Sequence, residues 1–132
     1  MGKKIIVVGG VAGGATAIAR LRRLSEDSEI ILLEKGEFIS FANCGLPYYI
    51  GGTIANRESL FVAGIDMVKS RYNIDIRNFS EVVKINKEEK TVTVKNVKDG
   101  SEYKESYDDL VLSTGSTPFV PPMEGVDIYI YV

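Results

Sequence analysis

The sequence predicts an α/β fold in which an antiparallel β-meander packs on a parallel sheet. Three observations predict it: two continuous apolar runs of strand length near the N-terminus, a glycine-rich turn and a helical pattern between them, and alternating strand-like segments from residue 74 onward. Continuous apolar strands are typical of a parallel sheet that is covered on both faces. At 132 residues, the chain has the length of about one domain.

Residues 3–8 form the first predicted strand, because they are an apolar run rich in β-branched side chains. A glycine-rich turn follows at residues 9–14, and residues 15–24 show the spacing of a helix. In this helix Ala17, Leu21 and Leu24 are expected to form the face toward the sheet.

A second buried strand, residues 29–33, ends in Glu34. Strand, glycine turn, helix, strand and terminal acid is the order of the first βαβ unit of a Rossmann-like, dinucleotide-binding fold. In such a unit the glycines let the helix N-terminus approach a pyrophosphate, and a terminal acid such as Glu34 accepts hydrogen bonds from a ribose hydroxyl. The G-x-G-x-x-G pattern read from Gly9 has Val11 in place of its second glycine and Gly14 as its third.

The rest of the chain is less regular in the middle and strand-rich toward the end. We expect a loop over residues 35–52 with a short helix opening at residues 47–50, a turn at residues 56–61 and a short helix at residues 65–72. Five further strands are predicted, at residues 75–78, 80–86, 91–96, 101–107 and 109–112, and the second to fourth of these form the meander. Residues 1–117 are predicted to be one incomplete domain, and residues 118–132 a linker and the truncated start of the next segment.

Composition excludes several functional classes. The net charge is −2, from 16 basic and 18 acidic residues, which gives no support for binding to nucleic acid or to a membrane. No apolar run has the length of a signal peptide or a transmembrane helix. A single cysteine fits a cytoplasmic location. The chain contains no histidine, so proton transfer must use other side chains, and we predict no metal site.

Cys44 is the only cysteine, so it cannot close a disulfide within the chain. A sulfur partner must therefore come from outside. It lies a few residues beyond the nucleotide-binding unit, where a thiol can be a nucleophile, a redox centre or the holder of a mixed disulfide. By itself, however, a lone cysteine is more often an inert buried residue.

One stripe of the first helix is polar. Thr16, Arg20 and Arg23 are spaced i, i+4 and i+7, away from the predicted apolar face. Arginine binds phosphate as a planar fork. Without further support, solvated surface is the simpler interpretation of helix arginines.

Five segments, taken together and in order, resemble the flavoprotein pyridine nucleotide–disulfide reductases, and more narrowly their coenzyme A–disulfide reductase branch. They are residues 7–17, 22–24, 34–35, 40–49 and 112–116. The most specific is residues 40–45, because relatives with one redox cysteine carry it in this context. The resemblance covers the chain up to about residue 127.

The resemblance implies an FAD site. The residues that it assigns to the cofactor are Gly9, Val11, Ala12 and Gly14 at the pyrophosphate, Glu34 at the adenosine ribose, Lys35 beside the adenine, the backbone of Val82 or Val83 at the adenine, and Thr114 and Gly115 where the chain returns to the flavin.

The resemblance also implies that Cys44 is the redox cysteine, alternating between a thiolate and a mixed disulfide with coenzyme A. Electrons would pass from NAD(P)H through FAD to that sulfur, whose nucleophilic form is the thiolate. The residues that it assigns to coenzyme A are Thr16, Arg20 and Arg23 for phosphate groups, Ser40 and Asn43 for the pantetheine arm, and Arg71 as a weaker candidate for a phosphate.

We therefore predict the N-terminal FAD-binding part of an NAD(P)H-dependent disulfide reductase that acts on coenzyme A disulfide, or on a related persulfide or polysulfide. The full-length parent is expected to be a homodimer with a nicotinamide-binding domain, a second FAD segment and a dimerisation domain, and this fragment alone to be inactive. One alternative is an NADH oxidase or peroxidase in which Cys44 cycles through a sulfenic acid. Another is a non-catalytic nucleotide-binding module. Arg20 and Arg23 favour the coenzyme A reading over the first alternative.

Overall fold

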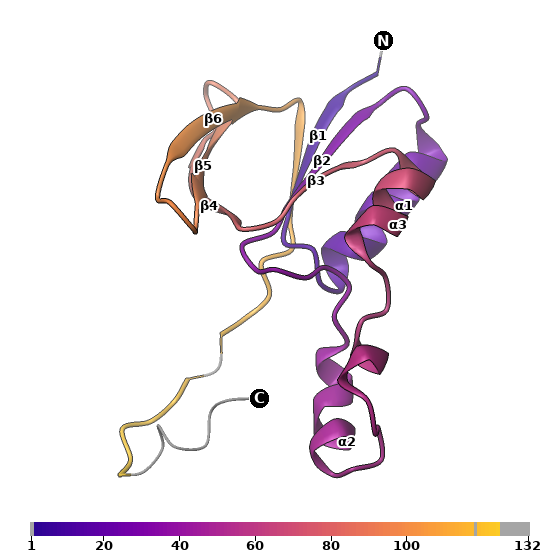
Figure 1. Ribbon diagram of the computed structural model, residues 1–132. Coiled ribbons are helices and arrows are strands. Elements are labelled where there is room, and N and C mark those ends of the chain that lie inside the picture. The colour runs from indigo at the N-terminus through magenta and orange to yellow at the C-terminus, as the bar shows by residue number, and fades with distance from the viewer. Residues whose placement is uncertain (1, 118, 125–132) are drawn as a thin grey trace.

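Three layers build the part of the protein that the computed structural model describes, residues 2–117 and 119–124. Figure 1 shows a parallel sheet in the middle, two helices on one of its faces and an antiparallel sheet on the other. This is the α/β arrangement that the sequence predicts. Of the segment expected at residues 118–132, residues 118 and 125–132 lie outside the described residues.

The parallel sheet has the strand order β3-β2-β1-β7. The strands are β1 (Lys4–Val8), β2 (Glu29–Leu33), β3 (Asp75–Arg77) and β7 (Asp109–Leu112). Val8, at the end of β1, pairs with Leu33 on one side and Leu112 on the other. The carboxyl ends of these three strands therefore meet at one edge of the sheet, which is where ligands bind in open parallel sheets.

Helices α1 (Gly13–Leu24) and α3 (Ile65–Tyr72) cover one face of this sheet. The apolar layer between them and the sheet consists of Ile5, Val7, Ile18, Ile30, Leu32, Ile39, Val68, Ile74 and Ile76. One expectation is wrong: Leu24 does not face the sheet but is 65% exposed. Gly14 and Ile18 are the buried positions of α1. Leu24 lies six residues after Ile18, which turns it about 120° away from that residue around the helix axis.

The opposite face of the sheet is covered by the predicted meander, formed by β4 (Ser80–Asn86), β5 (Thr91–Asn96) and β6 (Glu102–Ser106). Its strands pair antiparallel, as expected. Val92 and Val94 of β5 are fully buried, in a second apolar layer that they form with Ile6, Val8, Ile31 and Leu33 of the parallel sheet. The pairing of β4 with β5 shifts between Val82 and Lys84, so Val83 is an extra residue in a β-bulge.

A long connection with three short helical segments joins β2 to α3. It contains the 3₁₀ turn η1 (Asn43–Gly45), the short helix α2 (Leu46–Ile50) and the 3₁₀ turn η2 (Arg57–Leu60). Figure 1 shows it projecting beyond the edge where β1 and β2 end. An isolated bridge between Phe41 and Phe61 holds its two ends together, and the rings of these residues pack edge to face at 5.3 Å.

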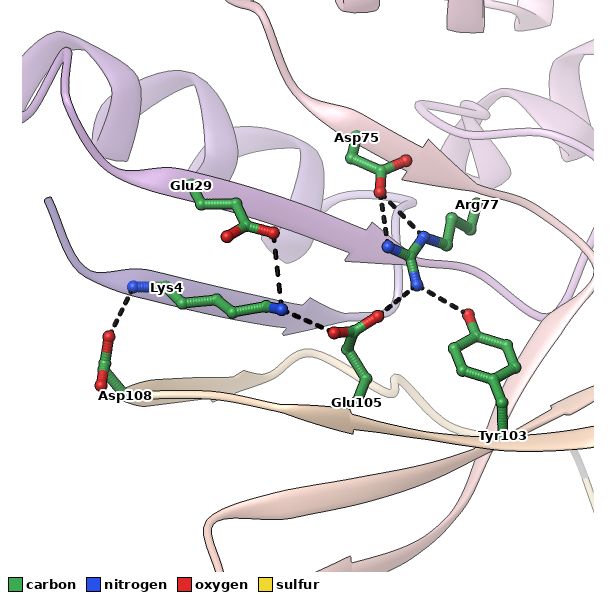
Figure 2. Close-up of polar contacts among 7 residues, drawn as sticks. All are labelled: Lys4, Glu29, Asp75, Arg77, Tyr103, Glu105 and Asp108. Carbon is green, nitrogen blue, oxygen red and sulfur yellow. Dashed lines mark hydrogen bonds and ion pairs between the residues drawn. The ribbon is translucent and has the colours of Figure 1, made fainter.

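A cluster of charges joins the parallel sheet to the meander. Figure 2 shows Glu105 of β6 between Lys4 of β1 and Arg77 of β3, at 2.6 Å from each nitrogen. Arg77 also contacts Asp75 and the hydroxyl of Tyr103. Burial by itself would raise the pKa of Glu105, but the hydrogen bonds from Lys4 and Arg77 outweigh it and hold the pKa below its ordinary value.

No helix in residues 2–117 and 119–124 is both long and apolar enough to cross a membrane.

Candidate functional site

The turn between β1 and α1 is packed so tightly that it requires glycine. Gly9 has φ = 91° and its N–H donates to the carbonyl oxygen of Leu33, 2.8 Å away. A Cβ at Gly9 would lie 2.2 Å from the carbonyl oxygen of Ser113. The turn therefore lies directly against the residue that follows β7.

Helix α1 begins with an open N-terminus. Its N-cap is Ala12, no side chain caps it, and no acidic residue stands in its first turn. A Cβ at Gly14 would lie 1.6 Å from the carbonyl oxygen of Gly9, so this glycine lets the helix approach the end of β1. The first N–H groups of a helix have no partner within it and carry the positive end of the helix dipole. This terminus therefore suits an anion such as a pyrophosphate.

The carboxylate of Glu34, directly after β2, is held from two sides. Oε2 accepts a hydrogen bond from the N–H of Gly10 and Oε1 accepts one from the N–H of Gly36, both at 2.7 Å. The side chain is buried, with 8% of its residue surface exposed. A carboxylate has about four acceptor positions, so two are left for hydroxyl donors. The Glu34 carboxylate can therefore accept the predicted hydrogen bonds from a ribose.

One cavity of about 580 Å³ lies at this edge of the sheet. Its lining residues are Val8, Gly9, Val11, Ala12, Leu33, Glu34, Lys35, Asn43, Ser80, Glu81, Val82, Ser113, Thr114, Gly115, Ser116 and Thr117. Eight of the nine residues predicted to bind the cofactor are among them. The ninth, Gly14, lies directly behind Gly9 and does not line the cavity.

Several lining residues were not predicted. Ser113 could have been found, because it directly follows a parallel strand and precedes Thr114 and Gly115. Ser80 and Glu81 could not, because they reach the cavity only through the way in which the meander is placed across the sheet. No local pattern in the sequence encodes that placement.

The loop that carries Cys44 is tied to the glycine turn. Ser40 adopts a left-handed conformation, with φ = 53°. Its N–H donates to the carbonyl oxygen of Gly10 at 2.9 Å, and its own carbonyl oxygen accepts from the N–H of Val62 at 3.1 Å. Such a conformation is uncommon outside glycine and is maintained here by these two bonds.

Cys44 itself is exposed, in the middle of η1. It does not line the cavity, but its neighbour Asn43 does. Asn43 is thus the only residue of the predicted substrate set that lines this cavity. Cys44 is therefore not the buried thiol that a lone cysteine more often is.

The remaining substrate candidates lie on the helices. Thr16, Arg20 and Arg23 are exposed, as the predicted stripe requires, and the hydroxyl of Thr16 donates to the carbonyl oxygen of Ala12 at 2.9 Å. Arg71 of α3 is exposed too, with its guanidinium carbon 5.7 Å from the centre of the Tyr72 ring. None of the four lines the cavity.

A second, smaller cavity of about 250 Å³ is almost wholly apolar. Its lining residues are Phe38, Ile39, Phe61, Ala63, Gly64 and Ile65. None of them belongs to the predicted site. In the described part of the chain, no group of three or more His, Cys, Asp and Glu side chains is placed to hold a metal ion.

Comparison with known proteins gives consistent matches. Residues 3–132 match the family described as pyridine nucleotide-disulphide oxidoreductase. A coenzyme A disulfide reductase of Staphylococcus haemolyticus is 46% identical over 114 residues, which are 86% of this chain and 26% of that protein. The chain therefore spans about a quarter of the length of such curated relatives.

Solved structures agree. The reduced CoADR-RHD protein of Bacillus anthracis is 60% identical, with a TM-score of 0.90, over 96% of this chain and 23% of that one. The NADH-bound, water-forming NADH oxidase of Lactobacillus brevis is 33% identical, with a TM-score of 0.87, over 95% of this chain and 28% of that one.

These matches confirm the predicted fold class and the resemblance seen in the sequence. The Lactobacillus brevis structure contains NADH, one of the nicotinamide cofactors that the sequence led us to expect. On this evidence, the chain belongs to the pyridine nucleotide-disulphide oxidoreductase family.

Proposed function

We propose that the chain is the FAD-binding part of an NAD(P)H-dependent disulfide reductase, and that the substrate is coenzyme A disulfide or a related persulfide or polysulfide. The observation that carries the proposal is the cavity at the carboxyl ends of β1, β2 and β7. It gathers a glycine turn, an uncapped helix start and a held carboxylate. The similarity to coenzyme A disulfide reductases supports the substrate.

The residues of the cavity fit FAD. The pyrophosphate would lie at the N-terminus of α1, against Gly9, Val11 and Ala12. A Cβ at Gly9 or Gly14 would clash with a backbone carbonyl oxygen, so glycine is needed at both positions to form this turn. Glu34 would accept hydrogen bonds from the adenosine ribose. The other proposed contacts to FAD are made by Lys35 and Val82 at the adenine and by Thr114 and Gly115 near the flavin. When bound, FAD supplies the two-electron chemistry that links NAD(P)H to a disulfide.

The chemistry of this chain's own residues centres on Cys44. Its thiolate would attack one sulfur of coenzyme A disulfide, form a Cys44–coenzyme A mixed disulfide and release the other coenzyme A as a thiolate. The exposed position of Cys44 leaves room for this attack. Ser40 and Asn43 would hold the pantetheine arm beside the sulfur.

The charged end of coenzyme A would be bound by the helices. Arg20 and Arg23 are exposed on one stripe of α1, and Arg71 is exposed on the neighbouring α3. Arginine forms strong, charge-assisted hydrogen bonds with phosphate. In the full-length protein we propose further domains for nicotinamide binding and for dimerisation, and a cytoplasmic location. We also propose that residues 1–117 belong to one domain and that a linker begins at residue 118.

The first experiment is the visible spectrum of the purified chain before and after adding FAD. Flavin absorbance that stays with the protein through gel filtration is expected. Equilibrium dialysis against FAD then gives the affinity. A protein that binds no added FAD would contradict the proposal that the cavity of this chain takes up the cofactor.

A second candidate function is supported by the similarity to the NADH oxidase of Lactobacillus brevis. In that case Cys44 would be oxidised by a peroxide to a sulfenic acid, with release of water or an alcohol. A sulfenic acid trapped by dimedone after peroxide treatment, together with no reaction with coenzyme A disulfide, would favour this function over the first.

A further inference from the structure

Arg22 differs from the other arginines of α1, because its guanidinium donates hydrogen bonds to backbone carbonyl groups. Nε donates to the carbonyl oxygen of Tyr72 and Nη2 to that of Asn73, both at 2.8 Å. Nη1 donates to the carbonyl oxygens of Ser25 and Glu26. The side chain therefore joins the C-terminal end of α1 to the C-terminal end of α3.

The carbonyl groups that Arg22 contacts lie at the ends of α1 and α3 or just beyond them. The last four carbonyl groups of a helix have no partner within it, and a cation there also interacts favourably with the helix dipole. At the end of α3 the chain turns sharply, since Asn73 is left-handed with φ = 48°. Loss of the guanidinium would leave these carbonyl groups without their donors and free the end of α3 from α1.

Arg71 is attached to this same end of α3. The Tyr72 ring, over which its guanidinium lies, is half-buried and packs against the apolar layer under the helices. The carbonyl oxygen of Tyr72 accepts from Arg22. Arg22 thus fixes the residue that orients Arg71, whereas Arg20 and Arg23 stand on α1 and do not depend on α3.

From these contacts we propose that Arg22 is a positioning residue for phosphate binding: it holds Arg71 at the place where α3 can share a phosphate-bearing ligand with Arg20 and Arg23 of α1. This inference rests on the proposed function, in which these three arginines bind coenzyme A. Within the described residues, none of the three forms an ion pair with an acidic side chain, so their charges are available to an anionic ligand.

The test is a pair of double-mutant cycles. The probe is adenosine 3′,5′-bisphosphate, which has the charged end of coenzyme A without its thiol, and binding to the whole chain is measured by calorimetry. Arg71→Met should weaken binding about tenfold in the unmodified chain. In the Arg22→Met background, the same change should weaken binding less than about twofold, because Arg71 is already misplaced.

The control cycle uses Arg20→Met, which should weaken binding by the same factor with or without Arg22, since both residues lie on α1. A general loss of structure would reduce both effects alike, so the difference between the cycles separates positioning from stability. If Arg22→Met does not fold by circular dichroism, Arg22→Lys is used instead, because lysine keeps the charge but cannot span four carbonyl groups.

Each outcome decides the matter. A full effect of Arg71→Met in the Arg22 variant overturns the positioning role alone and leaves the proposed function intact. Equal loss of both arginine effects in the Arg22 variant also overturns it. No binding of the probe by the unmodified chain overturns the assignment of the coenzyme A phosphates to these helices, and the inference with it. Loss of the Arg71 effect only supports the positioning role.

Discussion

Gly14 faces the carbonyl oxygen of Gly9 so closely that a Cβ atom at position 14 would lie 1.6 Å from it. Because the obstacle is backbone, no side-chain rotation can relieve the contact. We expect Gly14→Ala to lower the free energy of unfolding by about 3 kcal/mol and to abolish FAD uptake. Thermal unfolding and FAD titration measure the two effects.

The neighbouring glycine provides the control. A Cβ at Gly13 would meet only the side chain of Ser113, with Oγ at 3.1 Å, and that side chain can move. Gly13→Ala should change the free energy of unfolding by less than about 1 kcal/mol. A Gly14→Ala protein as stable as Gly13→Ala would show that α1 does not approach β1 this closely.

Glu34 needs both carboxylate oxygens, since each accepts from a backbone N–H. Glu34→Gln puts an NH₂ group against one of these donors, and we expect it to lower the free energy of unfolding by about 1–3 kcal/mol. FAD affinity should fall as well. Urea unfolding and equilibrium dialysis give the values, with Glu37→Gln, an exposed acid of the same loop, as the matched control. Equal stability of the two variants would argue against the held carboxylate.

Reaction of the chain with coenzyme A disulfide should add one coenzyme A, seen as a single mass increase by mass spectrometry. Because Cys44 is the only cysteine, the adduct has one possible site. Dithiothreitol should remove it, and Cys44→Ser should not form it. An unmodified protein after long incubation would contradict the nucleophilic role of Cys44.

The rate of that reaction also tests the arginines. Arg23→Met should slow modification by coenzyme A disulfide about tenfold, because a charge-assisted hydrogen bond to phosphate is lost. Modification by hydroxyethyl disulfide, which carries no phosphate, should keep its rate. Lys84→Met, an exposed charge on the meander, serves as the control for a general loss of charge. Equal slowing with both disulfides would place the effect of Arg23 on the thiol instead.

Acid should weaken the contact between the two sheets. The pKa of Glu105 is lowered in the folded chain, despite its burial, by hydrogen bonds from Lys4 and Arg77. A carboxylate with a lowered folded pKa contributes stability above its unfolded pKa, about 4.3, and loses that contribution as the pH falls through the folded pKa. We expect Glu105→Gln to be less stable than the unmodified chain by about 1–3 kcal/mol at pH 7, and the difference to shrink below about pH 4. Urea unfolding at several pH values measures it, and Glu102→Gln, exposed on the same strand, should show no such trend.

Much of the fold could be predicted because its signals are local. Apolar runs gave the strands of the parallel sheet, and alternation with polar turns gave the meander. The helical pattern begins at Ala15, two residues after the observed start of α1 at Gly13, because glycine has a low helix propensity. The tight packing of Gly14, which requires glycine there, is not visible in the sequence. The prediction for Leu24 is wrong because this residue lies about 120° around the helix axis from the buried Ile18.

The site could be predicted only where its residues come directly after a parallel strand in the sequence. The glycine turn, Glu34 and Thr114 each follow a parallel strand, and the carboxyl ends of neighbouring parallel strands meet at one edge of the sheet. Ser80 and Glu81 enter from another sheet, and the role of Arg22 depends on carbonyl groups fifty residues away in the sequence. These relationships arise from tertiary packing, which the periodicity of the sequence does not predict.

The pairing of Val8 with Leu112 joins residues 104 positions apart in the sequence. During synthesis β1 can pair with β2 early, but its other edge has no partner until β7 has left the ribosome. Pairing over such a separation is slow, and an unpaired apolar strand edge invites association with other chains in the meantime. Completion of the cavity is thus a late event in folding. The time course of flavin uptake, followed by its visible absorbance, would report when the cavity forms.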